Sequence, residues 1–169
     1  MIKQYKLSVD FNGIVIFNYP NILELFGGRI QNGQNILKDF TSSNLGEVAL
    51  DKGIALPILG LDDGDYLVRF YIDQQPENKN RKIIFSDKYF YLDVSDNLYV
   101  ADIIIFWDWD DYTGWNKIDI PQGIYKICLE GVHLLNDEGQ VLEHSYDLLM
   151  TSVPTIGIRN LEPRSDSRL

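Results

Sequence analysis

The sequence has few of the residues on which catalysis and covalent cross-linking depend. Its 169 residues include one cysteine and two histidines, so an internal disulfide is impossible and a reducing cytoplasm is the default setting. Cys128 lies inside an apolar run, where we expect a buried and unreactive thiol. No motif selects His133 or His144 as a catalytic base. The sequence therefore predicts a protein that is not an enzyme.

Longer signals are missing as well. No apolar run approaches the roughly 18 residues of a membrane helix. The N-terminal residues 1–13 alternate apolar and polar side chains, as a strand does and a signal peptide does not. The glycines of residues 27–33 lack the lysine and the serine or threonine of a phosphate-binding loop. We expect no cofactor, no membrane contact and a cytoplasmic location.

Positive charge is scarce in one half of the chain. The formal net charge is −10; residues 83–150 hold thirteen acidic and three basic residues, whereas residues 1–60 hold five of each. Such a surface repels phosphate backbones, so we do not expect nucleic-acid binding. It attracts a basic protein partner. The alternative is that the acidity only keeps the domain in solution.

What is present is a pattern of short alternating segments. Apolar residues make up 45% of the chain, and strands about ten residues apart with glycine and asparagine turns between them are typical of a sandwich. We predict an all-β fold, an antiparallel β-sandwich with one or two short helices, near residues 21–27 and 44–53. Residues 27–43 are expected to form a polar loop on the surface. Residues 1–155 would form a single β-sandwich domain and residues 156–169 a charged, frayed tail.

Two segments of the chain begin alike. Gly64 and Tyr66 open one alternating run, and Gly123 and Tyr125 open another. The repetition predicts equivalent strands in the two facing sheets.

The region 99–132 is the most distinctive. Its apolar runs 103–107 and 124–129 predict buried strands, and all three tryptophans lie within the nine residues 107–115. A period of two places Trp107 on the core face, which leaves Trp109 and Tyr112 as the exposed anchors of an interface. The predicted partner-binding residues are Asp108, Trp109, Asp110, Asp111, Tyr112 and Trp115, with the turn residues Asp62, Asp63 and Asp65 as a secondary set.

The aspartates of this loop do not form a known calcium motif. Asp108, Asp110 and Asp119 occupy positions 1, 3 and 12 of an EF-hand loop, but position 6 lacks the required glycine. We therefore assign no metal ligands. A different calcium site, a sugar-stacking platform and an unrecognised hydrolase stay open as alternatives.

Five segments carry a resemblance. They are LSVDFNGIVIF, EVALDKGIA, DYLVRFYI, KIIFSDKYFYLDVSDNLYVADI and IDIPQGIYKICLEGV, which together span most of residues 7–150. In this order they resemble the competence-associated (ComJ-like) inhibitors of a DNA-entry nuclease and, more broadly, small acidic antitoxin or immunity proteins. The stretches 27–43 and 106–116 depart from the family's pattern, so no partner-contacting residue is transferred. The resemblance implies an inhibitor that occludes the basic cleft of a cognate nuclease or toxin; a carbohydrate- or calcium-binding module is the rival hypothesis.

Overall fold

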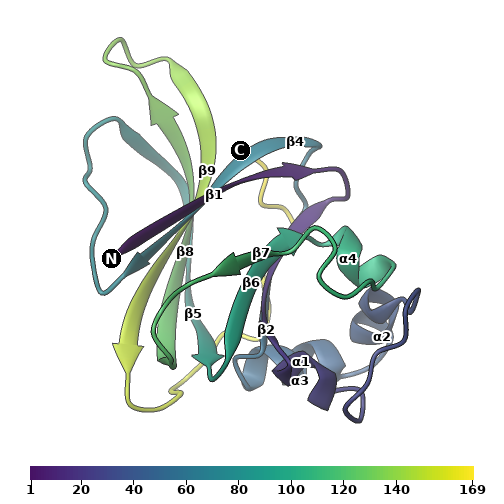
Figure 1. The fold of residues 1–169 in the computed structure, drawn as a ribbon. Helices are drawn as coiled ribbons and strands as arrows, with labels where there is room; N and C mark the ends of the chain where they lie inside the picture. Colours follow the sequence, from purple (N-terminus) through teal and green to yellow (C-terminus); the bar gives the residue numbers. More distant parts are fainter.

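A computed structural model describes residues 1–169 and contains nine strands in two sheets (Figure 1). The five-stranded sheet has the order β1 (Ile2–Val9), β4 (Gly64–Ile72), β9 (Val141–Val153), β8 (Gly123–Leu135) and β5 (Arg81–Val94). The four-stranded sheet has the order β3 (Ala55–Leu59), β2 (Gly13–Tyr19), β6 (Asn97–Asp102) and β7 (Asn116–Ile118). Apolar side chains of both sheets share one core. The predicted all-β sandwich is confirmed.

Two details differ from the prediction. Strands β4 and β9 pair in parallel, and four short helices replace the expected one or two: α1 (Asn21–Glu24), α2 (Ile36–Ser42), α3 (Leu45–Asp51) and α4 (Ile104–Trp107). Helix α2 lies within residues 27–43, which were predicted to form a polar surface loop. That prediction was wrong because Ile36 is fully buried, while the Asn35 side chain caps the helix by accepting a hydrogen bond from the Lys38 amide at 2.9 Å. No helix is long and apolar enough to cross a membrane.

Strand β2 is buried on both faces, which explains its nearly uninterrupted apolar sequence. Ile14 and Ile16 point into the core between the sheets. Val15 and Phe17 point the other way, into a second apolar cluster that the helices cover. The molecule therefore has two cores, one inside the sandwich and one between the four-stranded sheet and its helical cover.

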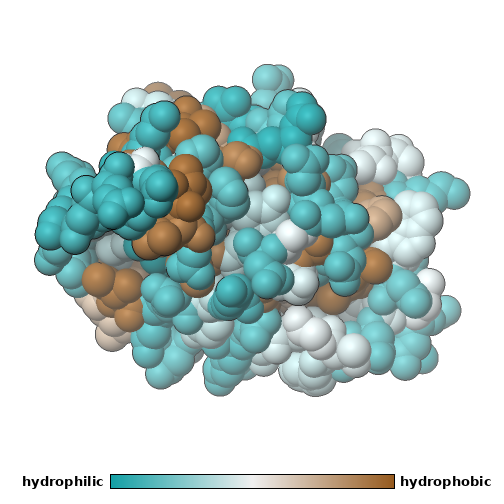
Figure 2. All heavy atoms as spheres, turned by 90° about the horizontal axis from the view of Figure 1, so that it is seen from above, coloured by the Kyte–Doolittle hydropathy of each residue, from teal (hydrophilic) through white to brown (hydrophobic).

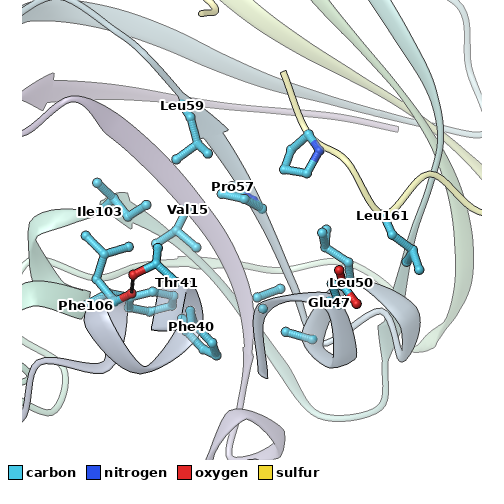
Figure 3. Close-up of a pocket in the computed structure, with 15 residues that line it drawn as sticks. Val15, Phe40, Thr41, Glu47, Leu50, Pro57, Leu59, Ile103, Phe106 and Leu161 are labelled. Atoms are coloured by element: carbon cyan, nitrogen blue, oxygen red, sulfur yellow. Dashed lines mark hydrogen bonds between the residues drawn. The ribbon is translucent and has the colours of Figure 1, made fainter. Parts of the chain in front are cut away.

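The second core is not completely filled. A pocket of about 210 Å³ lies between β2, β3 and the helices α2 and α3. Figure 3 shows Phe40, Leu50 and Pro57 around this space, with Leu161 of the C-terminal segment at one side. Its walls are mostly hydrocarbon, so the pocket belongs to the packing of the helices on the sheet.

The repeated glycine–tyrosine pattern has a structural meaning. The hydroxyl of Tyr66 donates to the carbonyl of Asp62, and the hydroxyl of Tyr125 donates to the carbonyl of Pro121, each at 2.8 Å and four residues back. Both are therefore tyrosine corners, which fix the turn before a strand. The strands β4 and β8 lie in the same five-stranded sheet, so the prediction of equivalent strands in facing sheets was wrong.

The C-terminal segment, expected to be frayed, packs against both sheets instead. The amide of Asn160 donates to the carbonyl of Tyr89 in β5 at 2.7 Å, and the amide of Ser167 donates to the carbonyl of Leu59 in β3 at 2.9 Å. The hydroxyl of Tyr146 in the core donates to the carbonyl of Ser167 at 2.7 Å. Because β5 and β3 are edge strands, the segment covers backbone groups that would otherwise be open to pairing.

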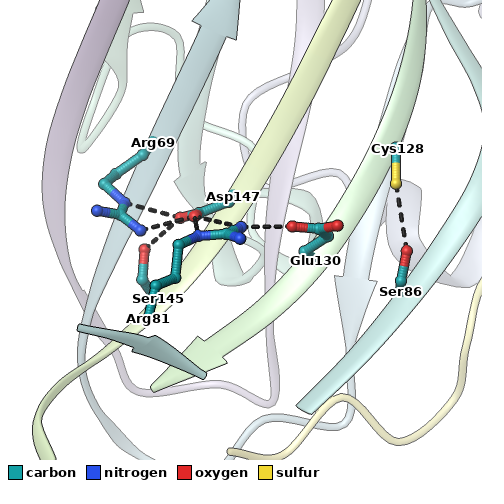
Figure 4. Close-up of polar contacts among 7 residues, drawn as sticks. All are labelled: Arg69, Arg81, Ser86, Cys128, Glu130, Ser145 and Asp147. Atoms are coloured by element: carbon teal, nitrogen blue, oxygen red, sulfur yellow. Dashed lines mark hydrogen bonds and ion pairs between the residues drawn. The ribbon is translucent and has the colours of Figure 1, made fainter. Parts of the chain in front are cut away.

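A charged network lies on the outer face of the five-stranded sheet (Figure 4). Asp147 is fully buried there and accepts hydrogen bonds from Arg69 at 2.7 and 2.6 Å and from Arg81 at 2.9 Å. Arg81 also pairs with Glu130. Burial opposes the charge of Arg81, but the two carboxylates outweigh it and raise the pKa of the guanidinium. The network ties β4, β5, β8 and β9 together.

Candidate functional site

Asp102, the last residue of β6, shapes the start of the loop between β6 and β7. The carboxylate of Asp102 accepts hydrogen bonds from the amide of Ile104 at 2.8 Å and from the amide of Asp10 at 2.7 Å. These two bonds hold the end of β6 where the chain turns into helix α4, whose N-cap residue is Ile103, so the predicted strand over residues 103–107 was wrong. The helical turn rotates Trp107 out of the core: its side chain is 52% exposed and its ring lies 5.4 Å from that of Phe11.

Trp109 is the buried tryptophan of the loop, contrary to the prediction that it is an exposed anchor. Its side chain has no exposed surface, and its indole N–H donates to Asp111 Oδ1 at 2.7 Å. Its main chain is bonded on both sides, with the amide donating to the carbonyl of Gln34 and the carbonyl accepting from the amide of Gly33. Trp109 therefore fixes the loop to the helical cover, and it cannot reach a partner.

The other aromatic residues of the loop gather on the four-stranded sheet. Trp115 is partly buried, with its ring 5.0 Å from that of Phe17 and 5.0 Å from that of Tyr112. Tyr112 is 56% exposed, as predicted, and adopts a left-handed backbone conformation with φ of 65°. Burial, followed by the neighbouring Tyr112 side chain, raises the pKa of Tyr19 to about 12. The rings of Phe17, Tyr19, Tyr112 and Trp115 thus pack the loop onto the four-stranded sheet.

On its other side the loop borders a groove of about 610 Å³ that we call the aspartate groove. The groove lies between the end of β1, helix α4 and the turn after Trp109. Its charged lining residues are Lys6, Asp10, Asp102, Asp108 and Asp110. Its apolar rim is exposed, with Ile104 42% and Trp107 52% accessible.

The four aspartates of the groove have different roles. The carboxylate of Asp102 is occupied by the amides of Ile104 and Asp10. One oxygen of Asp110 accepts a hydrogen bond from the Thr113 hydroxyl at 2.7 Å, which orders the turn. Asp10 and Asp108 are exposed, and their carboxylates accept no hydrogen bond and form no ion pair within the chain. Asp10, Asp108 and Asp110 are thus the carboxylates available to a partner.

The predicted loop aspartates lie in two different places. Asp108 and Asp110 line the groove, whereas Asp111 lines a separate polar hollow of about 540 Å³ beside Tyr19 and Arg29. Asp10, Ile104 and Trp107 were not predicted as site residues. Asp10 is far from the loop in sequence, and the pairing of β2 with β6, together with the hydrogen bond from its amide to Asp102, brings it there.

The secondary aspartates lie close to the same surface. The Nζ atom of Lys6 is 3.9 Å from Asp65 Oδ2, and Lys6 also lines the aspartate groove. Asp62 and Asp63 precede β4 in the same turn and are exposed. Of the secondary set, Asp65 is therefore the residue linked to the aspartate groove, through Lys6.

The surface seen from above is mainly polar. In Figure 2, hydrophilic side chains cover most of this face, and hydrophobic ones form separate small groups among them. No broad apolar docking face is visible from this side, so polar and charged contacts dominate it.

The residues considered for catalysis do not assemble. His133 and His144 are directly opposed on β8 and β9, with ring centroids 4.9 Å apart, and no serine nucleophile is bonded to either. Cys128 is half-buried rather than buried, because it lies on the outer face of β8 with its Sγ 3.3 Å from Ser86 Oγ. No group of three or more His, Cys, Asp or Glu side chains is arranged to hold a metal ion.

The structure is thus a small acidic β-sandwich with an open groove lined by carboxylates. No family model and no curated protein matches the sequence. Two solved structures are similar to it in fold. One is ComJ, inhibitor of the DNA degrading activity of NucA, from Bacillus subtilis, with a TM-score of 0.50, 14% identity and coverage of 90% of this chain and 99% of ComJ. The other is the protein of crocagin biosynthetic gene J, with a TM-score of 0.55, 14% identity and coverage of 91% and 97%.

Proposed function

We propose that this chain is an inhibitor that binds a basic enzyme, in the first instance a nuclease, through the aspartate groove. The observation that carries the proposal is the combination of three available carboxylates, Asp10, Asp108 and Asp110, with the exposed Trp107 and Ile104 in one groove. The fold supports it, because ComJ, which has a similar fold, is an inhibitor of the DNA degrading activity of NucA.

The mechanism is occlusion by charge mimicry. A nuclease cleft is built to hold phosphates with lysine and arginine side chains, so carboxylates on an inhibitor compete for the same groups. Trp107 supplies the apolar anchor that usually dominates such an interface. The loop is already ordered by Trp109, Asp102 and Thr113, so little conformational entropy is lost on binding.

The experiment begins with the partner. Wild-type chain is immobilised, basic proteins are captured from its own source, and each captured protein is assayed for DNA degradation with and without added chain. We expect a captured nuclease whose activity falls to background at one equivalent of chain. Capture of proteins without nuclease activity, or of an oligosaccharide whose binding needs Trp107, would contradict the proposal.

A matched pair of variants tests the groove. The first changes Asp10, Asp108 and Asp110 together to asparagine. The control changes Glu24, Glu138 and Glu162 to glutamine, three exposed residues away from the groove that make no side-chain ion pair or hydrogen bond. Both variants lose three negative charges, so only the groove variant should lose inhibition. Equal inhibition by the two variants would exclude the groove as the inhibitory surface.

Ionic strength provides a second readout. The Debye length falls from about 30 Å at 0.01 M to about 10 Å at 0.1 M salt, which weakens steering between exposed charges. The association rate of the wild type should therefore drop steeply over this range, whereas that of the groove variant should be slow and nearly salt-independent. Surface plasmon resonance separates the association rate from the dissociation rate.

A further inference from the structure

A second groove crosses the outer face of the five-stranded sheet. It has a volume of about 580 Å³ and lies over β9, β8 and β5, with Gln75 of the β4–β5 connection at its wall. The aspartate groove adjoins β1, at the opposite edge of this sheet. The charged side chains that line the second groove are Lys88, Lys126 and Glu130, and we call it the lysine groove.

The charge of Glu130 is already neutralised inside the protein. Glu130 pairs with Arg81, and Arg81 and Arg69 both pair with Asp147, so two guanidinium groups face two carboxylates (Figure 4). Lys88 and Lys126 form no ion pair with any carboxylate of the chain. They are therefore an uncompensated positive pair on one face of a protein whose formal net charge is −10. An anion bound between them would relieve their repulsion.

The rim of the groove has an unusual aromatic residue. Strand β5 has an irregular register between Lys88 and Phe90, and the residue between them, Tyr89, has a φ of 71°. A bulky side chain rarely adopts this left-handed conformation. The irregularity leaves the Tyr89 side chain 51% exposed, with the Nζ of Lys126 4.8 Å from the centre of its ring. Bulges of this kind commonly redirect a side chain beside a functional site.

We propose that the lysine groove binds a phosphorylated small molecule, with the phosphate group between Lys88 and Lys126. Two ammonium groups suit a phosphate monoester because it carries between one and two negative charges near pH 7. The hydroxyl of Thr151 and the amide of Gln75 can hydrogen-bond sugar hydroxyls, and Leu149 offers an apolar contact. The groove volume lies within the range of about 300–1,000 Å³ that is usual for small-molecule sites.

The test uses the full chain and amide-resolved NMR titrations with glucose 6-phosphate, adenosine monophosphate and inorganic phosphate. Glucose and adenosine serve as ligands that lack the phosphate. We expect saturable shifts of amides in β5, β8 and β9 around the groove with at least one phosphorylated ligand, and weak or no shifts with the unphosphorylated ones. Saturation by inorganic phosphate as well would show that the phosphate group alone is recognised.

Three variants test whether binding takes place in the lysine groove. Lys88→Gln and Lys126→Gln should each weaken binding about tenfold or more, because each removes a charge-assisted contact. Lys117→Gln is the matched control, since Lys117 is an exposed lysine of β7 outside the groove and its loss changes the net charge equally. The proposal is overturned if no phosphorylated ligand gives saturable shifts, if glucose binds as well as its phosphate, or if the control weakens binding as much as the groove variants.

Discussion

The two neighbouring tryptophans of the β6–β7 loop should respond in opposite ways to replacement by alanine. Trp109 has no exposed surface, whereas Trp107 is 52% exposed. Trp109→Ala removes a buried indole and the hydrogen bond to Asp111, and truncation of a buried Trp costs about 3–5 kcal/mol. For a chain of this size the midpoint of thermal unfolding should fall on the order of 10 °C. Trp107→Ala should lower it by no more than about 2–4 °C.

Binding should show the reverse order. If the aspartate groove is the inhibitory surface, Trp107→Ala should raise the dissociation rate, since a central aromatic anchor is worth about 2 kcal/mol or more, roughly thirtyfold in affinity. Folded Trp109→Ala should keep an association rate close to wild type, because the carboxylates that steer association are unchanged, and it should lose affinity only through the loosened loop. Circular dichroism gives the stabilities, and surface plasmon resonance gives the rates.

The two results refute different steps of the reasoning. A Trp109→Ala variant as stable as wild type would mean that the loop is not fixed by its buried indole. A Trp107→Ala variant that is destabilised as much as Trp109→Ala would mean that Trp107 is a core residue. If Trp107→Ala is stable and inhibits normally, the groove is not the contact surface. Trp109→Phe should lie between wild type and Trp109→Ala in stability, because it retains part of the buried area.

Three further predictions concern the rest of the structure. Asp147→Ala should destabilise the chain by about 3–5 kcal/mol in chemical unfolding, because it leaves the largely buried Arg69 without a carboxylate and Arg81 with Glu130 alone; a loss below about 1 kcal/mol would contradict the network. Deletion of residues 160–169 should cost at least about 2 kcal/mol, because it leaves the Tyr146 hydroxyl and the edges of β3 and β5 unpaired; an unchanged unfolding midpoint would show that the segment is frayed after all. Burial, followed by His144 and Lys82, lowers the pKa of His133 from 6.5, so its contribution to stability should be full above about pH 6.5 and be lost as the pH drops through the lowered pKa. His133→Gln should flatten this dependence below about pH 6.5; an equally steep dependence in the variant would assign it to other groups.

Local patterns in the sequence were sufficient for the fold class. The alternating segments and their turns predicted a β-sandwich, because a strand with one face in a core shows a period of two in its own sequence. The glycine–tyrosine pairs at the starts of β4 and β8 correctly indicated two strands that begin alike, since the bond from Tyr66 to Asp62 spans only four residues. The acidity of residues 83–150 is a property of composition and needs no structure. The EF-hand could also be excluded from spacing alone.

Tertiary structure decided which side chains are exposed and what lies beside them. Residues 103–107 have the composition of a strand, but they form a helical turn whose start is held by long-range bonds, from the Asp10 amide to Asp102 and from the Ile103 amide to Gly13. The turn exposes Trp107, while main-chain bonds to residues 33 and 34 hold Trp109 in the second core. The assignment of Gly64 and Gly123 to one sheet depended on the parallel pairing of β4 with β9, which no local pattern reveals. The aspartate and lysine grooves each combine residues from separate strands, so their charges become neighbours only after the sheets have formed.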